Sequence, residues 1–178
     1  EAERARNLEM NLRTRLYQQE QVGDDTVIEP VFNCGWRISR TGYGVQAEIH
    51  RADNDGHLGA RSWDAPITDL QKDFDKLSPR TFSVDREGTL AQQAQLQRVF
   101  DGILDVRIRG SYGWTMGLTI VAIDLIGLEN LMLFMYDDPD GLHRLMRFLR
   151  DDHLAHVKWM QDEGLLTLNN ENDYVGSG

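Results

Sequence analysis

The sequence predicts an α/β domain in which helices alternate with parallel strands. Short β-branched or aromatic runs of strand length occur near residues 26–32, 105–109 and 165–168. Amphipathic segments with helix-start signals lie between these runs, and no internal repeat or low-complexity segment interrupts the order. Strands separated by helices are typically parallel and joined by right-handed crossovers, so we expect one parallel sheet.

One incomplete domain is expected. The chain has 178 residues, of which 40% are hydrophobic, and this is enough for one sizeable core. Three strands are too few for a doubly wound sheet, and also for a (β/α)₈ barrel, which typically needs about 250 residues. We therefore expect residues 1–178 to form part of a domain that is truncated, cleaved or disordered beyond the glycine-rich end at Gly178.

Composition excludes several classes of protein. The net charge of -10 comes from scattered carboxylates, without a basic stripe, so nucleic acid is not an expected partner. Cys34 is the single cysteine, which excludes a disulfide framework within the chain and fits a reducing, cytoplasmic location. No secretory signal is recognisable and no apolar run reaches the ~20 residues of a membrane span, so no membrane association is expected.

The first elements are a helix, a strand and a hairpin. Apolar residues at helical spacing predict an amphipathic helix over residues 2–21, which Gly23 ends. The apolar run 26–32 follows as the first core strand. Two extended stretches between residues 36 and 50 flank a glycine-containing turn at 40–44, and they predict a β-hairpin excursion over 36–50.

Two helices and a strand come next. Residues with capping-box spacing begin at Thr68 and Thr89, and they predict helices over 69–77 and 90–103. In that motif a hydroxyl and an amide satisfy the free N–H groups at a helix start. The alternating polar and apolar residues of 105–109 predict a second short strand.

The last third of the chain holds the clearest helix signal. Residues 115–135 are apolar enough to form one or two buried helices. Asp138 followed by Pro139 combines a preferred N-cap with a proline at the first helical position, and predicts a long helix to about Glu163. The apolar run 165–168 that follows predicts a third core strand.

Two segments resemble the uroporphyrinogen decarboxylase family, a (β/α)₈ barrel family that also contains methyltransferases working with corrinoid methyl carriers. The first is Gly-Ser-Tyr-Gly-Trp-Thr at 110–115, which is similar to the family's glycine–proline–aromatic–threonine turn after a strand. The second is the block 135–146, with its aspartate-proline helix start, followed by a long helix and a strand that ends in polar residues. The order of elements from about residue 24 onwards is similar as well.

The resemblance implies the N-terminal part of a (β/α)₈ TIM-type barrel with parallel strands. An N-terminal helix would occupy residues 1–23 and the first part of the barrel 24–178, including the hairpin. The implied function is that of a decarboxylase-like lyase acting on a tetrapyrrole or a tetrapyrrole-bound group. The alternative is a corrinoid-dependent methyltransferase of the same family, with a corrinoid protein as partner; a homodimer is compatible with either. A third hypothesis, outside the family, is a non-catalytic α/β binding fragment.

Departures from the family's pattern bear on the reaction. Uroporphyrinogen decarboxylases carry an aspartate at the end of the first core strand, where this chain has Asn33, and a tyrosine that aligns here with Thr119. An asparagine cannot stabilise the cation that decarboxylation of a pyrrole acetate generates, so true decarboxylation is not expected. The family's methyltransferases bind zinc through a His-x-Cys pair and a later cysteine, at positions absent from this chain. No cofactor is therefore expected within it, and zinc would depend on residues missing from it.

Candidate site residues lie at the predicted strand ends, where barrel enzymes concentrate their chemistry. Arg107 and Arg109 lie two apart on one strand and so point the same way, as a clamp for carboxylates or phosphate would. Surface ion pairs are the alternative for these arginines, and a plain asparagine turn is the alternative for 169–172. The candidate catalytic residues are Asn33, Asn169, Asn170 and Glu171, and the candidate substrate-binding residues are Arg107, Arg109, Tyr112, Trp114 and Asn172.

Other reactive residue types fit structural roles better. Cys34 is expected to be a small buried residue, because a free cysteine is usually part of a core. His153 and His156 fall on the apolar stripe of the long helix and are expected to be core histidines rather than metal ligands. The glycines after residue 109 do not have GxGxxG spacing, so no nucleotide site is expected.

Overall fold

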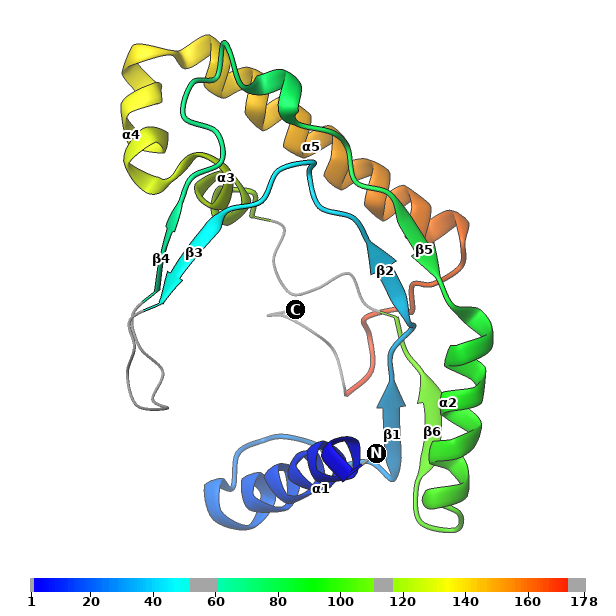
Figure 1. Ribbon diagram of the computed structural model, residues 1–178. Helices are drawn as coiled ribbons and strands as arrows, with labels where there is room; N and C mark the ends of the chain where they lie inside the picture. Colours follow the sequence, from blue (N-terminus) through cyan, green and yellow to red (C-terminus); the bar gives the residue numbers. More distant parts are fainter. Residues whose placement is uncertain (1, 52–60, 111–116, 173–178) are drawn as a thin grey trace.

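The computed structural model describes residues 2–51, 61–110 and 117–172, and within these ranges the chain is a mixed α/β structure (Figure 1). The helices are α1 (Ala2–Tyr17), continued by the π-helical turn η1 (Gln18–Val22), α2 (Arg86–Val99), α3 (Thr119–Ile126), α4 (Leu128–Asp137) and α5 (Pro139–Asp162), with a 3₁₀ turn η2 (Phe74–Lys76). The strands are β1 (Val31–Cys34), β2 (Ile38–Arg40), β3 (Glu48–Arg51), β4 (Arg61–Asp64), β5 (Phe82–Val84) and β6 (Asp105–Ile108), and they form two-stranded ladders.

β1 and β6 form a parallel pair, so two of the three strands of the predicted parallel sheet are found side by side. Val31 lies opposite Asp105 and Cys34 opposite Ile108. Helix α2 covers one face of this pair, as Figure 1 shows, and the ring of Phe32 lies 5.1 Å from that of Phe100 at the end of the helix. A hydrophobic cluster fills the space between helix and strands; its buried members are Cys34, Leu96, Phe100 and Val106.

The N-terminal helix docks on the same cluster. Leu8 and Leu12 of α1 pack against it, which gives the predicted amphipathic stripe its partner. Arg15 donates a hydrogen bond from its guanidinium to the carbonyl of Val31, at 3.2 Å, and so ties the helix to β1. Gly23 ends the helical segment with a φ of 63°, a conformation that glycine adopts without steric cost. The predicted helix over 2–21 is confirmed.

A second cluster joins helices α3, α4 and α5. Asp138 caps α5 by accepting a hydrogen bond from the N–H of Gly141 at 3.0 Å, and Pro139 occupies the first turn, so the predicted helix start is confirmed. Figure 1 shows α5 running from α4 towards β5 and α2. The buried residues of this cluster are Ile67, Leu70, Ala122, Leu125, Ile126, Leu131, Leu145 and Leu149.

Two helices, α3 and α4, lie in the predicted helical segment from residue 117 onwards, but both are only partly buried. Ala122, Leu125 and Ile126 are the buried residues of α3. Leu131 is the buried residue of α4, and Met132, Met135 and Tyr136 are exposed. In the described part of the chain no single helix is long and apolar enough to cross a membrane. The pair α3 and α4 reaches that length and composition only together, and it is bent by 95°.

A buried ion pair fixes the segment before β5 onto α5. The Asp152 carboxylate, whose side chain is 1% exposed, accepts hydrogen bonds from the backbone N–H and the Nε–H of Arg80 at 2.8 Å and 2.7 Å. The guanidinium of Arg80 also lies over the ring of Tyr43, with 4.9 Å from Cζ to the ring centroid. Both charges are therefore satisfied inside the protein, as buried charges must be.

The predicted hairpin over 36–50 is wrong. β2 pairs antiparallel with β5, and β3 pairs antiparallel with β4, so the two arms of the expected hairpin pair with later segments. The backbone N–H of Ser78 donates to the carbonyl of Tyr43, so the expected turn also contacts the later segment. A local turn signal does not specify the partner of a strand, because strand pairing is decided by tertiary packing.

Capping-box spacing mispredicts two helix starts. In place of the helix over 69–77 there are turns and η2, because the carboxylate of Asp73 accepts from the backbone N–H groups of Thr68 and Asp69, at 3.2 Å and 3.1 Å. Such side-chain hydrogen bonds compete with a helix. The next helix, predicted from residue 90, begins at Arg86 and is capped by Asp85, which accepts from the N–H of Gly88 at 2.8 Å.

Two predicted strands also differ from those in the structure. Of the first, only Val31 and Phe32 lie within β1, which then continues to Cys34, and residues 26–29 lie outside any strand. The third, over 165–168, is wrong as a regular strand. Its backbone link to the segment after β6 is one hydrogen bond, from the N–H of Thr167 to the carbonyl of Gly110, at 2.8 Å. The second strand, over 105–109, is confirmed as β6.

The buried ion pair gives a first prediction. We expect Asp152→Asn to lower the free energy of unfolding by about 3 kcal/mol, because it leaves the charge of Arg80 buried without its counter-ion. Asp151→Asn is the matched control on the same helix, where the side chain is 62% exposed, and should change stability by less than about 0.5 kcal/mol. Urea unfolding measures both. Equal costs for the two variants would contradict the role given to the pair.

His156 gives a second prediction. Its ring stacks on Phe82 at 4.3 Å, and its burial, reinforced by the positive charges of Arg80 and Arg40, lowers its pKa, while Asp152 opposes the shift. His156 is therefore protonated at a lower pH in the folded protein than in the unfolded chain, where it titrates near pH 6.5. Its contribution to the free energy of unfolding is complete above that pH and is lost as the pH falls below it.

His156→Phe keeps an aromatic ring against Phe82 and removes this titration. We expect the variant to lose less stability than the wild type between pH 7.5 and pH 5.5, measured by urea unfolding at both values. His153, whose pKa is also lowered by burial, accounts for part of the remaining slope. An unchanged pH dependence in His156→Phe would disprove the assignment.

Candidate functional site

The candidate site lies where β1 and β6 end side by side. Phe32 and Cys34 point from β1 into the cluster under α2, so strand alternation turns Asn33 to the opposite face. Asn33 lies directly opposite Arg107 in the parallel register. The carboxyl ends of both strands thus present polar side chains on one face, while their apolar neighbours anchor the strands to α2.

Two arginines converge there on one carboxylate. The guanidinium NH1 atoms of Arg107 and Arg109 lie 3.3 Å and 3.6 Å from Oε2 of Glu171. The side chain of Arg109 is 13% exposed and that of Arg107 is 51% exposed, so the pair spans from the interior to the surface. The prediction that the two arginines point the same way is confirmed by this shared contact.

The segment after α5 is held beside β6 by close backbone contacts. Thr167 donates from its N–H to the carbonyl of Gly110, and its Oγ1 accepts from the N–H of Gly110, each at 2.8 Å. Leu165 is buried beneath this contact. A Cβ at position 110 would clash with the carbonyl oxygen of Leu165, so only glycine permits the approach. Because this segment is held beside β6, the carboxylate of Glu171 lies next to the two arginines.

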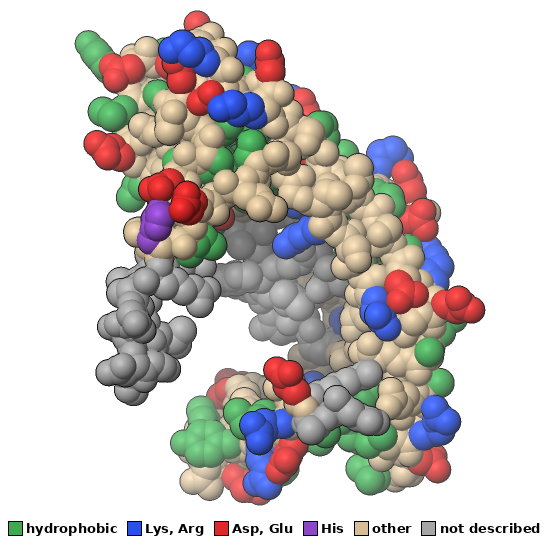
Figure 2. Space-filling model, viewed as in Figure 1, with side chains coloured by type: hydrophobic (Ala, Val, Ile, Leu, Met, Phe, Trp, Pro, Cys, Tyr) green, Lys and Arg blue, Asp and Glu red, His purple; other side chains and the backbone are tan. Residues whose placement is uncertain are grey.

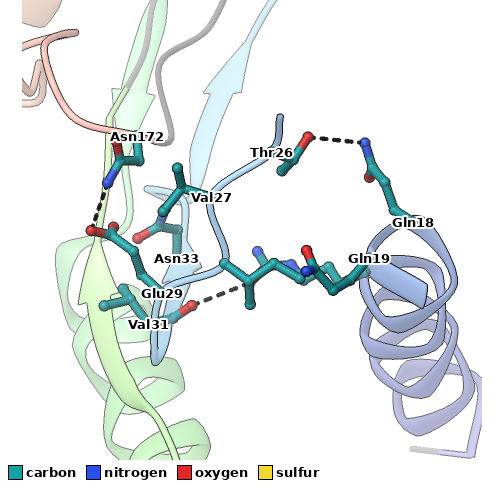
Figure 3. A pocket seen from close by; sticks show the side chains of 10 residues that line it. Gln18, Gln19, Thr26, Val27, Glu29, Val31, Asn33 and Asn172 are labelled. Carbon is teal, nitrogen blue, oxygen red and sulfur yellow. Dashed lines mark hydrogen bonds between the residues drawn. The ribbon is translucent and has the colours of Figure 1, made fainter. Parts of the chain in front are cut away.

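A cavity of about 210 Å³ opens next to Asn33, between α1 and the segment leading into β1 (Figure 3). Asn172 donates from Nδ2 to the Glu29 carboxylate at 2.9 Å and closes one side. Gln18 donates to the hydroxyl of Thr26 at 3.3 Å on the opposite side. The cavity is lined by Arg15, Gln18, Gln19, Thr26, Val27, Ile28, Glu29, Val31, Asn33 and Asn172.

The structure brings most of the predicted site residues together. Asn33 and Asn172 line the cavity, and Asn170 and Glu171 line a shallower hollow of about 670 Å³ that also includes Asp24 and Asp25. Asn169 is exposed and lines neither of these two hollows. Tyr112 and Trp114, predicted to contact substrate, lie outside the described residues.

Sequence reasoning missed five polar residues of the cavity: Arg15, Gln18, Gln19, Thr26 and Glu29. Arg15 and Gln18 lie three apart on the N-terminal helical segment, and Glu29 precedes β1. Spacing of i and i+3 places two side chains on one helix face, which was a usable signal for the first two. Glu29 carried no signal, because its role follows from the position of Asn172, which comes late in the chain.

The remaining reactive residues take structural roles. Cys34 is buried under α2 and burial raises the pKa of its thiol, so it is unsuited to act as a nucleophile and its predicted core role is confirmed. In the ranges 2–51, 61–110 and 117–172, no three His, Cys, Asp or Glu side chains are grouped to hold a metal ion. The site combines the guanidinium groups of Arg107 and Arg109 with the amides of Asn33 and Asn172 and the carboxylates of Glu29 and Glu171. Guanidinium groups bind and orient anions.

Gly110 gives a third prediction. We expect Gly110→Ala to lower the free energy of unfolding by about 1–3 kcal/mol, because the added methyl group forces the backbone of Leu165 away from β6. Gly35→Ala is the matched control, since a Cβ there meets no atom within 4 Å. Urea unfolding of both variants provides the measurement, and a cost at position 110 no greater than at 35 would argue against the close approach.

Comparisons with known protein families, proteins and solved structures identified no relative of the chain. No family model, no curated protein and no solved structure matches the chain. The resemblance carried by residues 110–115 and 135–146 therefore stays a prediction from those residues.

Proposed function

We propose that this chain is the N-terminal part of a (β/α)₈ barrel enzyme similar to the uroporphyrinogen decarboxylases. We propose further that its arginines bind the carboxylates of a tetrapyrrole. The observation that carries the proposal is the convergence of Arg107 and Arg109 on one carboxylate at the carboxyl end of β6. Barrel enzymes bind their substrates at that end of the strands, and guanidinium groups are the preferred partners of carboxylates.

The parallel pairing of β1 with β6 supports the barrel part of the proposal. Neighbouring strands of a barrel are parallel and are covered by helices on one face, as α2 covers this pair. The chain from Leu165 to Thr167 follows a long helix and contacts the segment after β6 at Gly110. The next strand of a barrel would likewise follow a helix and lie beside β6.

Local rather than overall charge would attract the ligand. The chain carries a net charge of -10, and Figure 2 shows acidic and basic side chains interspersed over the visible face. An anion is therefore repelled at long range and held by Arg107 and Arg109, with Arg15 lining the adjoining cavity. Such binding depends on short-range contacts, which is typical of recognition by charge-assisted hydrogen bonds.

Asn33 limits the reaction that we propose. Its neutral amide stands where the family has an aspartate, so the chain is proposed to act on a tetrapyrrole-bound group rather than to decarboxylate pyrrole acetates. This same residue favours the second candidate, methyl transfer involving a corrinoid protein, with any zinc supplied by residues that the chain does not contain.

Binding of uroporphyrin tests the proposal. We expect the full chain to bind uroporphyrin, followed by its fluorescence, and Arg109→Gln to weaken binding at least tenfold, since a hydrogen bond to a charged group contributes about 1.5–3 kcal/mol. Arg98→Gln, at an exposed position in the last turn of α2, is the control and should bind as the wild type does.

Two outcomes would redirect the proposal. Failure of the wild type to bind uroporphyrin would refute it, and binding of cobalamin in its place would favour the corrinoid candidate. We expect uroporphyrinogen not to be converted to coproporphyrinogen, because Asn33 replaces the aspartate.

A further inference from the structure

The arginine pair of the proposed site is occupied by the chain's own Glu171. One oxygen of that carboxylate lies 3.3 Å from Arg107 and 3.6 Å from Arg109. Charge-assisted hydrogen bonds to carboxylates are typically shorter, about 2.7–2.9 Å, and a guanidinium often binds both oxygens. The contact with Glu171 is therefore looser than the contact that a well-fitted ligand would make.

The segment that carries Glu171 is anchored firmly at its base and loosely at its tip. At the base, Leu165 is buried and Thr167 makes two hydrogen bonds with Gly110. At the tip, the side chain of Glu171 is 48% exposed, and the hydrogen bond from Asn172 to Glu29 lies at the surface. Exposed ion pairs and hydrogen bonds contribute little to stability, so the tip can leave the arginines while the base stays in place.

A tethered group competes with free ligand at a high effective concentration, on the order of millimolar for a short linker. A ligand with one carboxylate has to overcome this effective concentration with a single group, so it does not displace Glu171 at ordinary concentrations. A ligand with several carboxylates can place one on each of Arg107 and Arg109, so it gains more from the pair than the single carboxylate of Glu171 does.

We infer that Glu171 is a tethered competitor for the arginine pair, and that it restricts the site to ligands with several carboxylates. The inference rests on the proposed function in using the same two arginines. It goes beyond it by assigning Glu171 to selection of the ligand rather than to catalysis.

Removal of the Glu171 charge is the test. In the full chain, we expect Glu171→Gln to bind propane-1,2,3-tricarboxylate about 3–10-fold more tightly than the wild type and to gain measurable binding of acetate, both followed by calorimetric titration. Glu163→Gln is the control, because Glu163 also forms a half-exposed ion pair, with Arg86 at 2.8 Å, and its loss changes the net charge equally. Unchanged affinity in Glu171→Gln, or an equal gain in Glu163→Gln, would overturn the inference.

Parallel titrations with uroporphyrin separate this inference from the proposed function. Tighter tricarboxylate binding by Glu171→Gln without any uroporphyrin binding would leave the inference standing and refute the tetrapyrrole. Equal uroporphyrin binding by the wild type and Glu171→Gln, with unchanged tricarboxylate affinity, would do the opposite. Absence of all binding in every variant would overturn both. Thermal unfolding of Glu171→Gln should match that of the wild type and shows that the variant is folded.

Discussion

The ion pair between Arg80 and Asp152 is the contact on which the arrangement of the chain depends. It joins the middle of α5 to the segment entering β5, and β5 in turn pairs with β2, the strand after β1. Because both charges lie in the interior, they are stable only when their hydrogen bonds are complete, which allows one position of α5 relative to the strands. That position brings the chain after α5 against Gly110 and so determines where Glu171 lies.

Features encoded by neighbouring residues could be predicted from the sequence. Asp138 and Pro139 start α5 through contacts within one turn, and the alternation of β6 places Arg107 and Arg109 on one side. The hairpin over 36–50 failed because its strands pair with distant segments, and the helix over 69–77 failed because Asp73 binds the backbone N–H groups that would start it. Local patterns identify an element, but tertiary packing chooses its partner.

The residues of the candidate site were likewise predictable only where neighbouring residues encode their position. The predicted strand ends identified Asn33 and the arginine pair as candidates, because side chains at the carboxyl ends of parallel strands share one edge of the sheet. The sequence placed Glu171 near them but as a candidate catalytic residue, and only the structure shows its contact with both arginines. Glu29 joined the cavity through its contact with Asn172, which no local pattern encodes. Arg15 joined it through the docking of α1, and its spacing with Gln18 indicates only that the two share a helix face.

The parallel pairing of β1 with β6 has a consequence for the order of folding. It joins a strand near the start of the chain to one beyond its middle, with β2 to β5 and α2 in between. Such non-local pairing requires the intervening loop to lose conformational entropy before the strands make contact, whereas α2 and α5 form from neighbouring residues. Helical structure should therefore appear early during refolding, and the edge that carries Asn33 and Arg107 should be completed late.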